Sequence, residues 1–306
     1  MVYDRPTDRN LDLLLFRTPR GRPLGSLVRF AAHVIAAGHC PVPQYSAGFP
    51  GVLRHHVQSH FGGVCLAVNG PCGDITLFEQ DVFRFPDPID QPEPRGSLCM
   101  PHAGESDTWR EVARIGESLF APFSDPEDLS FEPLREMHVA QEEHHLLMRP
   151  DLVDVETAEK CYREHLAHFL ELARSRAPLG AIKKQVDRCR FYSEHKNFYG
   201  DWRYLWPADL SRKQVRCFVS TLRLGNEVIA GMPGEVFMEA GEAVRRSVKQ
   251  DRVHCFTATE CNGDIGYMPT QTDTPGGDYE PNCCVVTPQA GHFLSEAAVS
   301  LYAAGA

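Results

Sequence analysis

Four short segments of the sequence combine polar side chains with turn-forming residues, and each follows an apolar run that is typical of a strand. The first comprises residues 30–33 (Phe-Ala-Ala-His), where the predicted strand ends and His33 stands at the turn. In α/β folds, ligand-binding and metal-binding groups gather at such strand ends. His33 is therefore a candidate metal ligand, and the alternative is a structural histidine that only makes hydrogen bonds.

The second segment, residues 68–76, is an apolar strand that runs into a turn with two glycines. Asn69, Asp74 and Thr76 surround the glycines. Such a turn can present polar side chains and backbone N–H groups to a ligand. The alternative is a plain tight turn that is closed by a hydrogen bond from a side chain to the backbone.

In the third segment, residues 232–235 (Met-Pro-Gly-Glu), a strand ends in a Pro-Gly turn and Glu235 is predicted to stand at the start of a helix. A carboxylate at that position could simply complement the helix dipole, which is worth roughly 0.3–1 kcal/mol. It could equally be a metal ligand or a general base that the junction holds rigidly.

The fourth segment holds two tyrosines, Tyr267 and Tyr279, in stretches rich in glycine, threonine and aspartate. Aromatic residues that serve packing usually lie within strands or helices, so tyrosines in such a loop indicate a function. An ordinary surface turn is the alternative.

The order of these segments resembles that of the neutral/alkaline non-lysosomal ceramidase family. The resemblance covers about two thirds of the chain. Its parts are the strand that ends in a zinc-binding histidine, a Ser-Ala-Asp-aromatic-Pro-Gly segment, an Asn-Gly-x-x-Gly-Asp turn, a Pro-Gly-Glu with a zinc-binding glutamate, a Gly-Tyr that completes the metal site, and a second tyrosine. In this chain they correspond to residues 30–33, 45–51, 69–74, 233–235 and 266–267, and to Tyr279.

The resemblance implies a zinc-dependent amidohydrolase that cleaves an N-acyl amide, either ceramide-like, as in sphingolipid metabolism, or a soluble N-acyl compound. Zinc would be held by His33, Glu235 and Tyr267. The resemblance gives Thr76 and Tyr267 catalytic roles, and it gives Asn69, Asp74 and Tyr279 contacts with the substrate.

The chain also departs from the family's pattern. No His-x-His-Ser segment is present, Thr76 replaces a nucleophile-like serine, and Gly48 replaces an aspartate. The sequence ends at its closing helix, so we expect the family's C-terminal immunoglobulin-like domain to be absent. His39 and His102 are candidate replacements for the missing histidine. Two alternatives follow: a catalytically inactive ceramidase-like binding protein, or one part of a split hydrolase.

The pattern of apolar residues predicts an α/β fold, with a mixed sheet, flanking helices and an inserted helical block over about 106–210. We expect one ceramidase-like hydrolase domain over 1–306, N-terminally incomplete relative to the family. Ser106 or Asp107 is a candidate cap of the first helix in the block. Predicted strands cover 11–16, 26–33, 64–69 (buried), 214–224, 227–232 and 254–260. Predicted helices cover 50–61, a segment from 106 or 107 to 120, 133–148, 155–173, 233–247 and 290–301.

Composition narrows the class of protein further. The 306 residues carry a formal net charge of −10, which argues against a nucleic-acid-binding chain. No apolar run approaches the roughly 20 residues that span a bilayer, and the polar N-terminus lacks a signal peptide. The 11 cysteines include no CxxC pair, which favours reduced thiols in a cytoplasmic protein. We expect a small-molecule substrate as the partner, and nothing in the composition opposes an oligomer.

Overall fold

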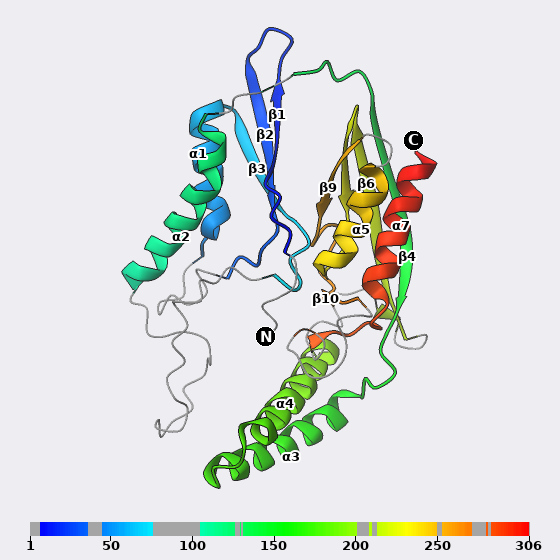
Figure 1. Cartoon of the computed structure of the whole chain (residues 1–306). Helices are drawn as coiled ribbons and strands as arrows, with labels where there is room; N and C mark the ends of the chain where they lie inside the picture. Colours follow the sequence, from blue (N-terminus) through cyan, green and yellow to red (C-terminus); the bar gives the residue numbers. More distant parts are fainter. Residues whose placement is uncertain are drawn as a thin grey trace. The chain divides into compact units, whose positions relative to one another are not determined.

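The computed structural model describes residues 7–35, 45–75, 105–125, 129, 131–200, 208–209, 213–249, 253–270, 280 and 283–305. Contacts divide the chain into two compact units (Figure 1). Unit 1 comprises Met1–Asp8, Gly70–Asp74 and Arg135–Ala306, and unit 2 comprises Arg9–Asn69 and Ile75–Leu134. Each unit combines a sheet with helices, so the predicted α/β class with a mixed sheet is confirmed.

Unit 2 is built on a small mixed sheet in which β2 lies between β1 and β3. β1 runs antiparallel to β2, and β3 runs parallel to it. Alternate strand residues face one side, where Val28 and Cys65 join Leu53, Val57 and Phe61 of α1 in one core. The elements are β1 (Asp12–Arg17), β2 (Pro23–Phe30), α1 (Gly48–Phe61), β3 (Val64–Asn69), α2 (Glu105–Phe120) and a short 3-10 helix (Ala121–Phe123).

Two details of unit 2 differ from the prediction. The strand β3 has the predicted bounds, but Val64 and Leu66 are 62% and 60% exposed, because β3 is an edge strand and α1 covers only one of its faces. The helix α2 already includes Glu105, so Ser106 and Asp107 lie in its first turn and do not cap it.

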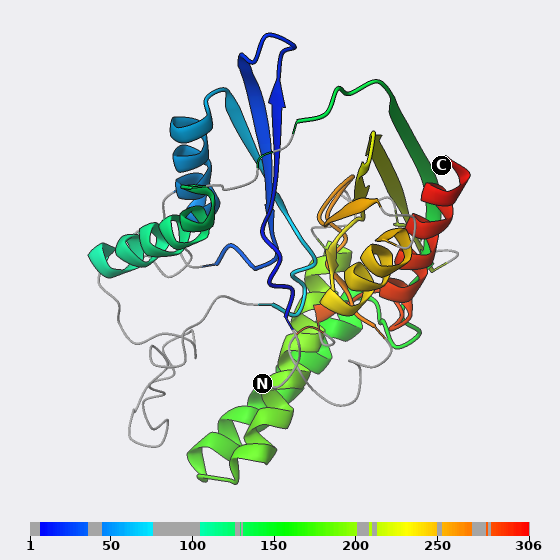
Figure 2. The same ribbon diagram turned by 45° about the horizontal axis from the view of Figure 1, so that its top comes forward.

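Unit 1 is built on a larger mixed sheet with the strand order β4-β6-β7-β9, and β5 pairs with β6. Helices α5 and α7 lie on one face of this sheet (Figures 1 and 2), where Val219 of β6, Val244 of α5 and Leu294 of α7 share one core. The elements are β4 (Met137–Leu147), β5 (Ala208–Asp209), β6 (Gln214–Leu224), β7 (Glu227–Gly231), β8 (Glu235–Val236), α5 (Met238–Lys249), β9 (His254–Ala258), β10 (Tyr267–Met268) and α7 (Ala290–Ala304).

The predicted helix over 133–148 is wrong, because these residues contain the strand β4. β4 pairs antiparallel with β6 from Met137 opposite Leu224 to Leu147 opposite Gln214. His144 and His145 therefore lie on a strand inside the predicted helical block. A long pairing partner, which lies far away in the sequence, outweighed the local preference of these residues.

Between β4 and β6 the chain forms a helical hairpin of α3 (Val155–Arg174) and α4 (Leu179–Gly200). The helix predicted over 155–173 is thereby confirmed. Asp154 caps α3, because its carboxylate accepts a hydrogen bond from the Thr157 N–H at 2.8 Å. Figures 1 and 2 both show the turn between α3 and α4 at the end of the hairpin that is farthest from the strands of the same unit.

The nine cysteines that lie in the described ranges are free thiols. Over the same ranges, no helix is both long and apolar enough to cross a bilayer.

Candidate functional site

Glu235 lies in β8, a two-residue strand that runs parallel to β10 and places Tyr267 directly opposite Glu235. The prediction that Glu235 opens a helix is wrong, since α5 begins at Met238. The Glu235 N–H donates to the Gly266 carbonyl at 2.8 Å. This N–H therefore pairs with the segment that leads into β10 and does not belong to a helix. Helix-dipole complementarity therefore does not explain this carboxylate.

The turn before β8 depends on Gly234, whose φ of 68° lies in the left-handed region. A Cβ at this position would also lie 2.5 Å from the Gly266 carbonyl oxygen. The Gly234 N–H donates to the Gly263 carbonyl at 3.1 Å, so the turn is tied to the loop that precedes β10. The backbone thus holds the Glu235 and Tyr267 positions together.

The side chains of Glu235 and Tyr267 are joined by a hydrogen bond, in which the phenol is the donor to the ionised carboxylate. The structure therefore brings together two of the three predicted metal ligands. This contact makes the phenol a donor in the present arrangement.

The surroundings of Glu235 disfavour its negative charge. Burial raises its pKa to about 7, and the nearby carboxylates Asp264, Glu260 and Glu280 act in the same direction, while the Tyr267 hydrogen bond opposes them in part. Such a carboxyl group can exchange a proton near neutral pH, or it can bind a cation that neutralises the surplus of negative charge.

Three carboxylates that raise the pKa of Glu235 were given no role by the sequence analysis: Glu260, Asp264 and Glu280. Glu260 and Asn262 both have a positive φ, of 57° and 61°, so a tight turn carries the acidic residues past β9. The Glu260 N–H donates to the Gly234 carbonyl at 2.9 Å, which fixes this turn against β8. Three acidic residues near the Gly-Tyr segment were the available sequence signal.

The loop of residues 70–74 belongs to the same unit as Glu235. Its Gly73 N–H donates to the Val236 carbonyl at 3.0 Å, and the Asp74 carboxylate accepts from the Met238 N–H at 2.8 Å. A Cβ at Gly73 would collide with the Glu235 carbonyl oxygen. Asp74 therefore holds the start of α5, beside any contact it makes with a substrate.

Cys72 of this loop is buried, and so is Thr259. The Thr259 hydroxyl donates to the Gly70 carbonyl at 2.7 Å, and the Cys72 Sγ lies 4.0 Å from the Thr259 Oγ1. Burial, with the negative charges of Glu260 and Glu235, raises the pKa of the Cys72 thiol well above its usual range. Cys72 therefore stays protonated and supports the loop by packing.

His33 and Asn69 belong to unit 2: Asn69 is the last residue of β3, and His33 lies three residues after the end of the neighbouring strand β2. The Ala32 N–H donates to the Asn69 side-chain carbonyl at 3.3 Å, and the His33 N–H donates to the Ile75 carbonyl at 3.1 Å. The residues on either side of the 70–74 loop thus fix the backbone of His33. Thr76, Tyr279, His39 and His102 lie outside the described residues.

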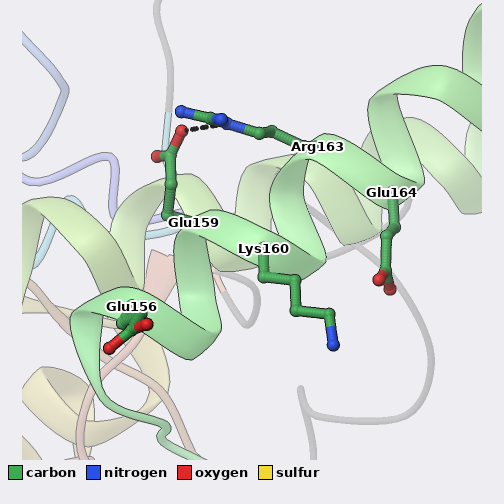
Figure 3. Close-up of a pocket in the computed structure, with 5 residues that line it drawn as sticks. All are labelled: Glu156, Glu159, Lys160, Arg163 and Glu164. Atoms are coloured by element: carbon green, nitrogen blue, oxygen red, sulfur yellow. Dashed lines mark hydrogen bonds and ion pairs between the residues drawn. The ribbon is translucent and has the colours of Figure 1, made fainter.

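No group of three or more His, Cys, Asp or Glu side chains within the described ranges is arranged to hold a metal ion. An open hollow on the surface of α3 contains none of the predicted site residues (Figure 3). Its charges are partly paired, since Arg163 and Glu159 form an ion pair at 2.7 Å. It is lined by Glu156, Glu159, Lys160, Arg163 and Glu164.

No protein-family profile and no curated sequence matches the chain. Among solved structures, neutral ceramidase from Pseudomonas aeruginosa is similar, with a TM-score of 0.56 and 14% identity over 95% of this chain and 46% of that chain. A ceramidase complexed with C2 is similar to the same degree, with a TM-score of 0.55 and 13% identity over 95% of this chain and 47% of that chain. The chain spans about half the length of each structure, and it shares their fold.

Proposed function

We propose that the chain is a zinc-dependent amidohydrolase that cleaves an N-acyl amide. The observation that carries the proposal is the Glu235–Tyr267 pair, a half-buried carboxylate and a phenol that lie opposite each other near three further carboxylates. The fold shared with neutral ceramidases supports the same class of reaction.

The chemistry of the donors fits a zinc ion. Carboxylate and imidazole are ligands that zinc takes, and a catalytic site commonly uses three protein ligands. A cation beside Glu235 would relieve the repulsion from Asp264, Glu260 and Glu280 that raises its pKa. Glu235 and Tyr267 are the proposed ligands within unit 1. His33, a residue of unit 2, stays the predicted histidine ligand, and its backbone is fixed by the residues that flank the 70–74 loop.

Zinc, when bound, supplies a water of lowered pKa and a polarised carbonyl. The residues of the chain supply the rest. As the alternative to binding the ion, Tyr267 would donate to the oxyanion once its hydrogen bond to Glu235 is released. Thr76 and Tyr279 would position the amide.

Asn69 and Asp74 contribute in this proposal through the backbone as well as through the substrate. Asn69 holds Ala32, next to His33, and Asp74 holds Met238, just after β8. Each therefore fixes a segment that carries a proposed ligand. A displacement of about 1 Å at such a position is enough to lower a rate substantially.

The length of the acyl chain distinguishes two classes of substrate. A ceramide-like lipid amide and a soluble N-acyl compound share the same scissile bond, so both belong to the proposal. Comparing hydrolysis of a short-chain and a long-chain fluorogenic N-acyl amide would identify the preferred class.

The decisive experiment is the zinc content of the purified chain after exhaustive dialysis, measured by elemental mass spectrometry beside amide hydrolysis. We expect close to one zinc ion per chain. Glu235→Gln and His33→Ala should both lose zinc and activity. The matched control is Glu227→Gln, which alters a carboxylate of β7 whose partner is His254 at 2.7 Å, and it should keep both.

Retention of zinc and activity by Glu235→Gln and His33→Ala would contradict the proposal. A wild-type chain without zinc or hydrolysis would instead assign it to a ceramidase-like binding protein. Activity that appears only with a second chain supplying a His-x-His-Ser segment would assign it to a split hydrolase.

A further inference from the structure

The tip of the α3–α4 hairpin, defined as residues 170–184, is positively charged, whereas the protein as a whole is negatively charged. The whole chain carries a formal net charge of −10. The tip holds four cations and one acidic residue, Glu171. The cations are Arg174, Arg176, Lys183 and Lys184.

Most of this positive charge is uncompensated. Lys183 pairs with Asp187 at 2.8 Å. The exposed side chains of Arg174, Arg176 and Lys184 form no ion pair with any other residue in the described ranges. Nearer the start of α3, by contrast, a carboxylate accepts from two cations: Glu159 binds Arg163 at 2.7 Å, drawn in Figure 3, and Lys196 at 3.0 Å.

Apolar side chains lie among these cations. Leu179 is 62% exposed and Leu170 is 36% exposed. The connection between the helices is ordered by its backbone, since the Ala177 N–H donates to the Leu172 carbonyl at 2.9 Å and the Ala181 N–H donates to the Pro178 carbonyl at the same distance. The tip is thus a fixed surface that combines cations with exposed leucines.

We propose that the tip docks on an anionic lipid surface. Clustered Lys and Arg side chains attract acidic headgroups, and neighbouring leucines can enter the boundary between headgroups and acyl chains. A polyanion such as RNA would bind to the cations alone, and the leucines would stay exposed to water. This inference goes beyond the proposed reaction and does not depend on it.

The test is co-sedimentation of the full chain with vesicles of phosphatidylcholine alone, or mixed with phosphatidylserine at a ratio of about three to one. We expect binding to the mixed vesicles only, weakened by added salt. The triple variant Arg174→Gln, Arg176→Gln, Lys184→Gln should bind on the order of a hundredfold more weakly, because each cation near the surface contributes. Leu179→Ser should weaken binding less and leave its salt dependence unchanged.

The matched control removes three cations elsewhere in the same unit, through Arg163→Gln, Arg216→Gln and Arg246→Gln, and should bind as the wild type does. Circular dichroism checks that every variant is folded, and hydrolysis of a short-chain soluble amide should not change in any tip variant. Equal binding to neutral vesicles, no binding to either kind, or full binding by the tip variant would overturn the proposal. RNA binding that matches vesicle binding and ignores Leu179→Ser would overturn it as well.

Discussion

The loop region around β8 and β10 and the base of the α3–α4 hairpin each withdraw an ionisable side chain from water, but the charges around the two side chains differ. Glu235 has a hydroxyl partner and stands among further carboxylates. His195 is completely buried, and neither ring nitrogen has a hydrogen-bond partner within the described part of the chain. Its ring lies on Phe191, with the ring centroids 3.8 Å apart.

The difference lies in the sign of the neighbouring charges. Burial raises the pKa of Glu235 to about 7 and lowers the pKa of His195 to about 4, so both favour the neutral form. The nearby Arg149 guanidinium further opposes a charged His195, while Asp151 favours it in part. The carboxylates around Glu235 would stabilise a bound cation. The surroundings of His195, in contrast, stabilise the uncharged imidazole ring. Of these two residues, Glu235 is therefore the candidate for binding a cation.

The largest expected effect is on stability, when a glycine in each of the two regions is replaced by alanine. Gly73→Ala should lower the free energy of unfolding by about 4 kcal/mol, because its Cβ would collide with the backbone of Glu235, which cannot move away easily. Gly180→Ala, on α4, meets nothing within 4 Å and should stabilise the hairpin by up to about 1 kcal/mol. Urea unfolding of both variants measures the contrast, and similar values for the two would remove it.

The second effect concerns acid. The folded pKa of His195, about 4, lies below its ordinary value of 6.5, so the unfolded chain takes up the proton first as the pH falls. Stability should therefore decrease from about pH 6.5 to pH 4, by up to about 3 kcal/mol. His195→Leu should remove this loss, which urea unfolding at a series of pH values would detect. An unchanged pH profile in His195→Leu would show that His195 is already charged or solvated.

The third effect has the opposite sign and requires metal-free protein. The folded pKa of Glu235, about 7, lies above its ordinary value of 4.5, so the unfolded chain releases the proton first as the pH rises. Stability should decrease between about pH 4.5 and pH 7, by about 2 kcal/mol after allowance for partial contact with solvent. Glu235→Gln should abolish this loss in the presence of a chelator, with Glu227→Gln as the control. If Glu235→Gln keeps the wild-type slope, the acidic field around Glu235 is not what the unfolding reports.

Local patterns predicted the bounds of two strands. Residues 64–69 form a short, nearly continuous apolar run, and in 214–224 buried residues alternate with less buried ones, which is the period of a strand. β4 was missed because it is an edge strand whose exposed residues include Gln141, Glu143 and His145, which are weak strand formers.

The sequence identified two residues of the candidate site, but it did not predict the strands and charges that surround them. The order of short motifs singled out Glu235 and Tyr267, which the structure places in register. The two-residue strands β8 and β10 and the acidic field were beyond local reasoning, since they join segments about thirty residues apart in the sequence. His33 as a zinc ligand stays a prediction.

The smallest effect asks whether Asp74 serves the fold or the substrate. Asp74→Ala should destabilise the chain by about 1 kcal/mol, because the Met238 N–H at the start of α5 loses its acceptor. Asp154→Ala, which removes the cap of α3, should cost a similar amount without changing hydrolysis. Asp74→Asn keeps an oxygen acceptor, so it should restore stability. If Asp74→Asn is stable but hydrolyses amides as poorly as Asp74→Ala, the charge of Asp74 acts on the substrate. If Asp74→Asn regains activity together with stability, the residue acts by holding the junction between β8 and α5, and the contrast with the hairpin then rests on Glu235 and Tyr267.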